Sequence, residues 1–186
     1  MIRTFIAVKL PDIVRRLLEE QALAFEKLLP DGTVRWVKPE LMHLTLRFLG
    51  DTADDRLPAI YDALDRVGTE TAPFTLRLEK SGAFPIPRRP RVLWAGLQDD
   101  AGQAAALKQR LDAALTPLGW EPEARPFTSH ITLGRTKGDQ RTVATLPLGK
   151  ALPPAEAPVT AIHLIESKLR PAGPVYSTLH TARLLG

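Results

Sequence analysis

The feature that most constrains the fold is a short motif, His-x-Thr-Leu, which occurs twice, as HLTL from His43 and as HITL from His130. Each copy follows a strand-like and then a helix-like segment, and another strand-like segment comes after it. These segments are 3–9, 11–29 and 74–82 in the first half, and 91–97, 101–118 and 159–169 in the second. The order predicts one domain over 1–186 with an internal repeat, roughly 1–87 and 88–186.

The mixture of elements predicts an α+β protein. Helices and strands do not alternate with the glycine-rich turns that a doubly wound parallel sheet would show. We therefore expect two pseudo-symmetric lobes with mostly antiparallel sheets, helices outside and an active cleft between the lobes. In the first helix, apolar spacing predicts an inward face, and the Pro- and Arg-rich stretch 83–90 is predicted to be a connection. The residues predicted on that inward face are Ile13, Leu17, Leu18, Phe25 and Leu28.

Alternation along a strand puts the histidine and threonine of each motif on one face and the two apolar residues on the other. Each copy thus presents an imidazole and a hydroxyl above an apolar anchor. Two imidazoles suit a phosphate diester, because one removes a proton from water while the other protonates the leaving oxygen. The hydroxyls of Thr45 and Thr132 are expected to bind the phosphate oxygens. The alternative is two unrelated strands in which threonine merely favours β structure.

Composition excludes several other classes of protein. With no cysteine, the chain has no disulfide, thiolate metal site or cysteine nucleophile, and the cytoplasm is the expected location. No segment is typical of a signal peptide or a membrane span. Motifs for ATP-driven ligation, dinucleotide binding, serine hydrolysis and zinc proteolysis are missing. The net charge of +4 and the pI near 9.6 favour a polyanionic partner.

Several segments together resemble the two-histidine phosphoesterases, and among them the bacterial and archaeal RNA 2',3'-cyclic phosphodiesterases, historically called 2'-5' RNA ligases. These segments are RTFIAV near the start, LMHLTLRFLGD at 41–51, GAFPIPRRPRVLWAG at 82–96, RPFTSHITLGR at 125–135 and IESKLRPAGPVYSTL at 165–179. The resemblance implies a two-lobed α+β fold, no metal or cofactor, and hydrolysis of RNA 2',3'-cyclic phosphate ends to a 2'-phosphate. One departure is Ser129, where the family often has proline.

The resemblance also implies roles for the motif residues. His43 matches the proton donor to the leaving oxygen, His130 matches the base for water, and the two threonines match phosphate ligands; spacing alone does not say which histidine is which. The expected partner is RNA with a cyclic phosphate end, with tRNA halves as one candidate, and the protein is expected to be a monomer that does not bind membranes. Reversible 2'-5' ligation would use the same residues. The alternatives are a non-catalytic RNA- or nucleotide-binding module and a metal centre that adds Asp51 or Glu166 to the histidines.

Further RNA contacts are predicted outside the two motifs. The arginine-rich connection is expected to hold RNA phosphates through Arg88, Arg89 and Arg91. Phe84 is a candidate for base stacking, with a core anchor as the alternative. Arg135 lies on the opposite face from His130 by strict alternation, so a phosphate contact there requires a bend. Within the family-like C-terminal segment, Tyr176 and Ser167 are candidates to line the cleft. His163 and His180 are expected to be structural or surface residues.

Overall fold

The computed structural model describes all residues 1–186 as nine strands and four α-helices with three short 3-10 turns, and every strand pair is antiparallel. The strands are β1 (Ile2–Lys9), β2 (Val34–Trp36), β3 (His43–Thr52), β4 (Phe74–Ile86), β5 (Arg89–Gln98), β6 (His130–Thr136), β7 (Glu156–Val159), β8 (Ala161–Arg170) and β9 (Gly173–Arg183). The helices are α1 (Asp12–Glu26), α2 (Leu57–Thr69), α3 (Gln103–Leu115) and α4 (Gln140–Val143), with 3-10 turns at Pro39–Leu41, Asp54–Arg56 and Thr116–Leu118. The α+β prediction is confirmed. No helix is long and apolar enough to cross a bilayer.

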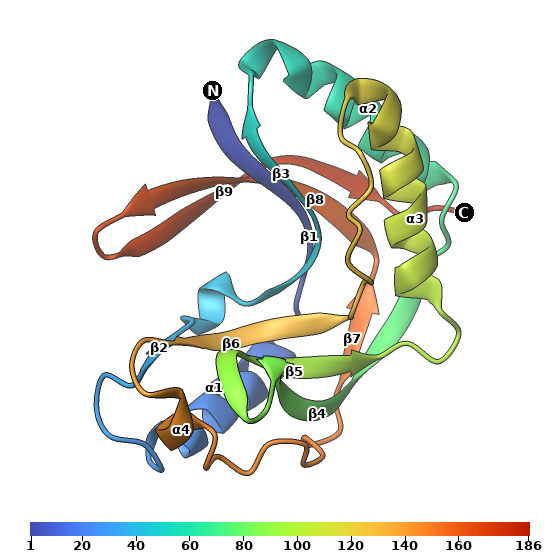
Figure 1. Ribbon diagram of the computed structural model, residues 1–186. Helices are drawn as coiled ribbons and strands as arrows, with labels where there is room; N and C mark the ends of the chain where they lie inside the picture. The colour runs from blue at the N-terminus through green and yellow to red at the C-terminus, as the bar shows by residue number, and fades with distance from the viewer.

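The sheet is curled into two wings with helices on the outside (Figure 1). The first wing holds β3, β1, β8 and β9 in that order, and α2 and α3 pack against it. The second wing holds β6, β5, β4 and β7, with β2 also paired to β6, and α1 and α4 pack against it. The wings join only where Leu44 of β3 pairs with Ile131 of β6. The two motifs therefore lie at the junction of the wings.

The two halves of the sequence do not form one wing each. Strand β4 comes from the first half but pairs with β5 and β7 of the second wing, whereas β8 comes from the second half and pairs with β1. Helices cross over in the same way, since α1 contacts β6 and α3 contacts β3. Each wing is thus built from both halves, which ties the two motifs into one cooperative unit.

Helix α1 buries a face that overlaps the predicted one only in part: Leu18 and Phe25 are buried as predicted. Its buried side chains are Val14, Leu18, Ala22 and Phe25, one continuous stripe at helical spacing. Ile13 and Leu28 were predicted inward, and that prediction is wrong: they are 51% and 61% exposed. The correct stripe passes through Ala22, whose small side chain makes it easy to overlook in a pattern of large apolar residues.

The stretch 83–90 is not a connection, which corrects the sequence prediction. Strand β4 continues to Ile86 and β5 starts at Arg89, so only a tight turn separates them. Pro85 pairs with Pro90 at a shift in the strand register. Because each proline lacks an N–H group, placing the two opposite each other at an irregular point confines the loss of ladder hydrogen bonds to one position.

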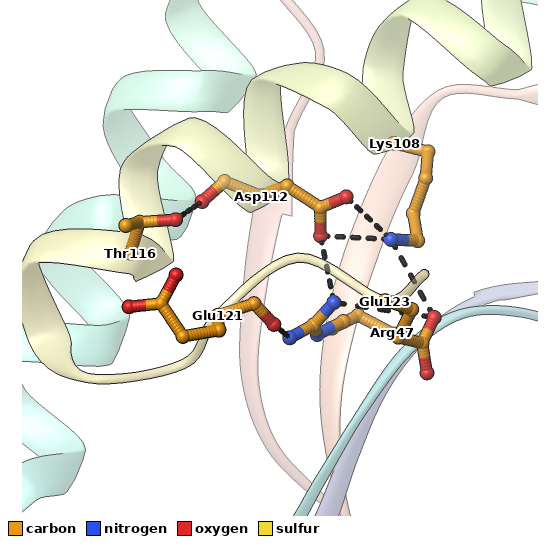
Figure 2. Close-up of polar contacts among 6 residues, drawn as sticks. All are labelled: Arg47, Lys108, Asp112, Thr116, Glu121 and Glu123. Atoms are coloured by element: carbon orange, nitrogen blue, oxygen red, sulfur yellow. Dashed lines mark hydrogen bonds and ion pairs between the residues drawn. The ribbon is translucent and has the colours of Figure 1, made fainter. Parts of the chain in front are cut away.

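A buried ion network fixes the segment that precedes the second motif (Figure 2). Arg47 of β3 is only 4% exposed, and it donates hydrogen bonds to the carboxylate of Asp112 on α3 and to the carbonyl of Glu121. Lys108 also bonds Asp112, at 2.6 Å, and lies 3.5 Å from the carboxylate of Glu123. Removing Asp112 would leave the buried charges of Arg47 and Lys108 without their closest partner, at a cost of about 3–5 kcal/mol.

Candidate active site

Both motifs place their histidine and threonine on one face of the sheet. Leu44 and Ile131, which bridge the wings, are 1% and 0% exposed and anchor the opposite face in the core. Their antiparallel pairing, continued by one residue in each direction, sets His43 opposite Thr132 and Thr45 opposite His130. The four polar side chains are partly exposed. The structure therefore brings together all four predicted residues on one face of the sheet, where the wings join.

The two imidazoles are held in the same way. His43 Nδ1 lies 2.7 Å from the carbonyl oxygen of Leu41, and His130 Nδ1 lies 2.7 Å from that of Thr128. A carbonyl oxygen only accepts, so each Nδ1 carries the hydrogen and the neutral ring has its lone pair on Nε2. The Nε2 atom of His43 lies 2.9 Å from the hydroxyl of Thr45. Each motif thus fixes its ring through Nδ1; Nε2 of His130 has no protein partner, whereas Nε2 of His43 is shared with the hydroxyl of Thr45.

Burial lowers the pKa of both histidines below the ordinary value of 6.5. Desolvation is the largest cause in each case, and the hydrogen bond to the backbone carbonyl partly opposes it. The charge of His130 further lowers the pKa of His43, and the charge of Arg135 further lowers that of His130. A charge on His130 thus disfavours a second charge on His43, and we expect the two rings to titrate as a coupled pair.

Aromatic rings hold each imidazole from the side. Phe5 of β1 stacks on His43 with ring centroids 4.9 Å apart, and Tyr176 of β9 meets the same ring edge-on at 5.5 Å. Phe84 packs edge-on against His130 at 4.9 Å. Phe84 also packs against Trp94, is partly buried and lies outside the hydrophobic core, so base stacking by this ring stays a prediction.

Arg135 shares the active face, because β6 contains the bend that a phosphate contact requires. Trp94 pairs with Thr132, but the next pair along β5 is Leu93 with Gly134, so β6 has one extra residue at this point. Such a bulge shifts the alternation by one, and Arg135 then points to the same side as His130. Glycine is required at position 134 because β2 passes close to it: a Cβ atom there would lie only 2.6 Å from Val34 Cγ1.

The same irregularity follows the first motif and turns Phe48 onto the active face. Ala7 pairs with Thr45, but the next pair along β1 is Ile6 with Arg47, so Leu46 is the extra residue. Phe48 therefore lies on the active face, 56% exposed. The sequence analysis did not identify Phe48. The signal was its position five residues after His43, which is the position of Arg135 relative to His130.

The remaining predicted contacts fall in two places. Tyr176 lies beside His43, and Ser167 pairs with it across the β8–β9 ladder. Burial raises the pKa of the Tyr176 hydroxyl, and the charges of Arg135 and Arg3 oppose that rise. By contrast, the three arginines of the β4–β5 hairpin do not contact the histidines. They line a separate groove at the end of the second wing; these are Arg88, Arg89 and Arg91.

The other two histidines and the suggested metal ligands lie elsewhere. His163 bonds the hydroxyl of Thr181, and burial, with a smaller effect from the charge of Lys9, lowers its pKa to about 4. His180 pairs with the carboxylate of Asp65 at 2.7 Å. No three His, Asp or Glu side chains converge anywhere in the structure as a metal cluster would require, so Asp51 and Glu166 do not join the motif histidines.

Comparison with known proteins agrees with this geometry. The sequence profile of the LigT-like phosphoesterase family matches residues 8–94 and 96–176, so that one matched stretch holds His43 and the other His130. The chain belongs to this family. The resemblance seen in the sequence is therefore confirmed.

Relatives and solved structures match this LigT-like phosphoesterase over nearly its full length. The RNA 2',3'-cyclic phosphodiesterase of Thermus thermophilus is 35% identical, with 99% of this chain and 91% of the relative covered. That of Methanothermobacter thermautotrophicus is 32% identical, with 98% and 99% covered. A crystal structure of a Thermus thermophilus protein has a TM-score of 0.79 at 34% identity, covering 99% of this chain and 98% of that one. Escherichia coli LigT complexed with 3'-AMP has a TM-score of 0.78 at 26% identity, covering 100% and 99%.

Proposed function

We propose that the protein hydrolyses the 2',3'-cyclic phosphate at an RNA end and leaves a 2'-phosphate. The observation that carries the proposal is the pair of imidazoles at the junction of the wings, each fixed through Nδ1 with Nε2 left for proton transfer. Relatives of 32% and 35% identity are named RNA 2',3'-cyclic phosphodiesterase. One chain supplies both histidines, so a monomer is sufficient. RNA fragments with a cyclic end, such as tRNA halves, are the proposed substrates.

In the proposed reaction, water attacks phosphorus and the bond from phosphorus to the 3'-oxygen breaks. His130 removes a proton from the water through Nε2, and His43 in its protonated form gives a proton to the departing 3'-oxygen. Atoms balance, because one water is consumed and its two hydrogens end on the base and on the product phosphate. The assignment of base to His130 follows the family resemblance. If an RNA 5'-hydroxyl replaced water, the same steps would form a 2'-5' linkage.

The other residues on the active face supply binding groups. The hydroxyls of Thr45 and Thr132 are proposed to donate to the non-bridging phosphate oxygens, where charge accumulates in the transition state. Arg135 is proposed to bind the same phosphate through its planar guanidinium. Phe48 presents an exposed ring on the active face beside Phe5, which suits a nucleobase. Tyr176 is proposed to keep the imidazole of His43 in place.

A binding module without turnover is not favoured by this geometry. Recognition of a phosphate requires donors but does not require two imidazoles that are both fixed at Nδ1 with Nε2 on the same face. The deciding experiment is turnover of adenosine 2',3'-cyclic phosphate by the purified protein in excess EDTA, with the product isomer identified by ³¹P NMR. Formation of adenosine 2'-phosphate is expected. Binding without turnover, or activity that appears only after a divalent ion is added, would contradict the proposal.

Replacing either threonine of the motifs with valine should slow the reaction without unfolding the protein. Valine keeps the shape of threonine and removes the hydroxyl, so Thr45→Val and Thr132→Val are each expected to lower kcat about 10- to 1000-fold, as for the loss of an oxyanion donor. Thr136→Val serves as a control, because its hydroxyl bonds the carbonyl of Pro90 and not the cleft. Normal kcat in both motif variants would show that their hydroxyls are not phosphate ligands.

A further inference from the structure

A strongly basic groove lies at the outer end of the second wing, apart from the histidines. It has a volume of about 560 Å³ and is lined entirely by polar residues and glycine. Three of its arginines come from the β4–β5 hairpin, and the fourth, Arg141, comes from α4. The lining residues are Arg88, Arg89, Arg91, Gly138, Asp139, Gln140 and Arg141. The chain thus brings a fourth arginine, some fifty residues away in sequence, to face the arginine-rich hairpin.

The positive charge of this groove is not neutralised within the protein. None of its four arginines makes an ion pair, whereas Arg15 and Arg77 elsewhere on the surface pair with aspartates. The one carboxylate in the groove, Asp139, accepts hydrogen bonds from the backbone N–H of Arg141 and from the hydroxyl of Thr142. Four gathered guanidinium groups with one carboxylate repel one another, and a polyanion relieves that repulsion.

The groove lies just beyond the end of β6, the strand that carries His130. Arg135 lies opposite Val92 on β5, and the hydroxyl of Thr136 bonds the carbonyl of Pro90, so the end of this ladder is tied to the arginine hairpin. Residues 138–141 follow directly after β6. Gly138 lies eight residues after His130, at most roughly 25 Å away at the rise of a strand. An RNA strand of several nucleotides is long enough to span that distance.

We propose that this groove binds backbone phosphates of the RNA several nucleotides away from the reacting end, so that the protein selects polynucleotides over free cyclic nucleotides. This inference rests on the proposed function and adds a second binding region to it. Arginine suits the role, because its fork of donors matches phosphate oxygens. The absence of apolar and aromatic lining residues indicates contacts with the backbone and not with bases, so the contribution is independent of sequence.

The test compares a series of cyclic-phosphate substrates, from a mononucleotide to an octanucleotide. In the wild-type protein, kcat/KM is expected to rise with length until the strand reaches the groove. The double variant Arg91→Gln/Arg141→Gln removes one arginine from each side, and it should lose about tenfold in kcat/KM on the octanucleotide. For binding of a 2'-phosphate octanucleotide, the slope of log K against log salt concentration should be about 1.4 less steep in the double variant than in the wild-type protein. Each phosphate contact to a single strand contributes about 0.7 to that slope, and the variant loses two arginines.

The matched control is Arg66→Gln/Arg183→Gln, which removes the same charge from exposed positions on α2 and β9 in the first wing. Equal losses in the two double variants would mean that only net charge matters, and the groove would be rejected. Equal kcat/KM for wild-type protein on all lengths would also overturn the inference. Neither result would contradict the proposed hydrolysis, because turnover of the mononucleotide is measured separately. That turnover is expected to be unchanged in the groove variant.

Discussion

Alanine in place of either His43 or His130 is expected to lower kcat on adenosine 2',3'-cyclic phosphate by about 10²- to 10⁴-fold, the usual contribution of a positioned acid or base. Both rings are fixed through Nδ1, and truncation removes the imidazole that transfers the proton. The backbone carbonyl that bonded Nδ1 loses only a partly exposed partner, so the fold should be retained. The double variant should be little slower than the slower single variant, because two groups that serve one step do not contribute additively.

Two controls make this prediction specific. His163→Ala and His180→Ala remove histidines outside the cleft, and each should keep a kcat close to that of the wild-type protein. Thermal unfolding should confirm that the motif variants are folded. Strictly multiplicative losses in the double variant would indicate two independent roles, and a normal kcat in either motif variant would remove that histidine from the mechanism.

Much of the site was predictable because the spacing of residues within each motif determines which side chains share a face. Alternation along a strand is a local property, so the shared face of His43 and Thr45, and that of His130 and Thr132, followed from spacing alone. The apolar residue between them identified the buried face, and Leu44 and Ile131 are indeed in the core. Duplication of the motif then suggested that the two rows meet, which the junction of the wings provides.

What spacing could not supply was the position of residues beyond the first irregularity. A bulge after each motif shifts the alternation by one, and nothing in the residue types of HLTLRF or HITLGR marks where the extra residue lies. For that reason Phe48 was not identified from the sequence. Strict alternation also placed Arg135 on the face opposite His130, and only a bend in the strand could bring it to the phosphate. The interleaving of the halves was equally hidden, because it depends on which distant strand edges β4 and β8 pair with.

Arg135 provides the second large effect. Arg135→Met keeps much of the length of the side chain and removes its charge, so kcat/KM is expected to fall about 10²- to 10³-fold if the guanidinium stabilises the phosphate in the transition state. Arg135→Lys should recover part of this loss, because the charge remains while the fork of donors is lost. Arg125→Met, in the exposed segment before the second motif, is the matched control and should change little.

The same variant distinguishes the roles of the two histidines through the pH profile of kcat/KM. In the wild-type protein burial lowers the pKa of both rings, so we expect a bell whose limbs belong to the coupled pair and lie below those of exposed histidines. The charge of Arg135 disfavours protonation of His130, so its removal should raise the pKa of His130. If His130 is the base, it must be neutral, and the acidic limb moves to higher pH, which narrows the bell. If His130 is instead the acid, the alkaline limb moves to higher pH and the bell widens.

Arg135→Lys keeps the charge and should leave both limbs close to their wild-type positions. A pH profile of Arg135→Met that does not move at all would show that the charge of Arg135 does not act on His130.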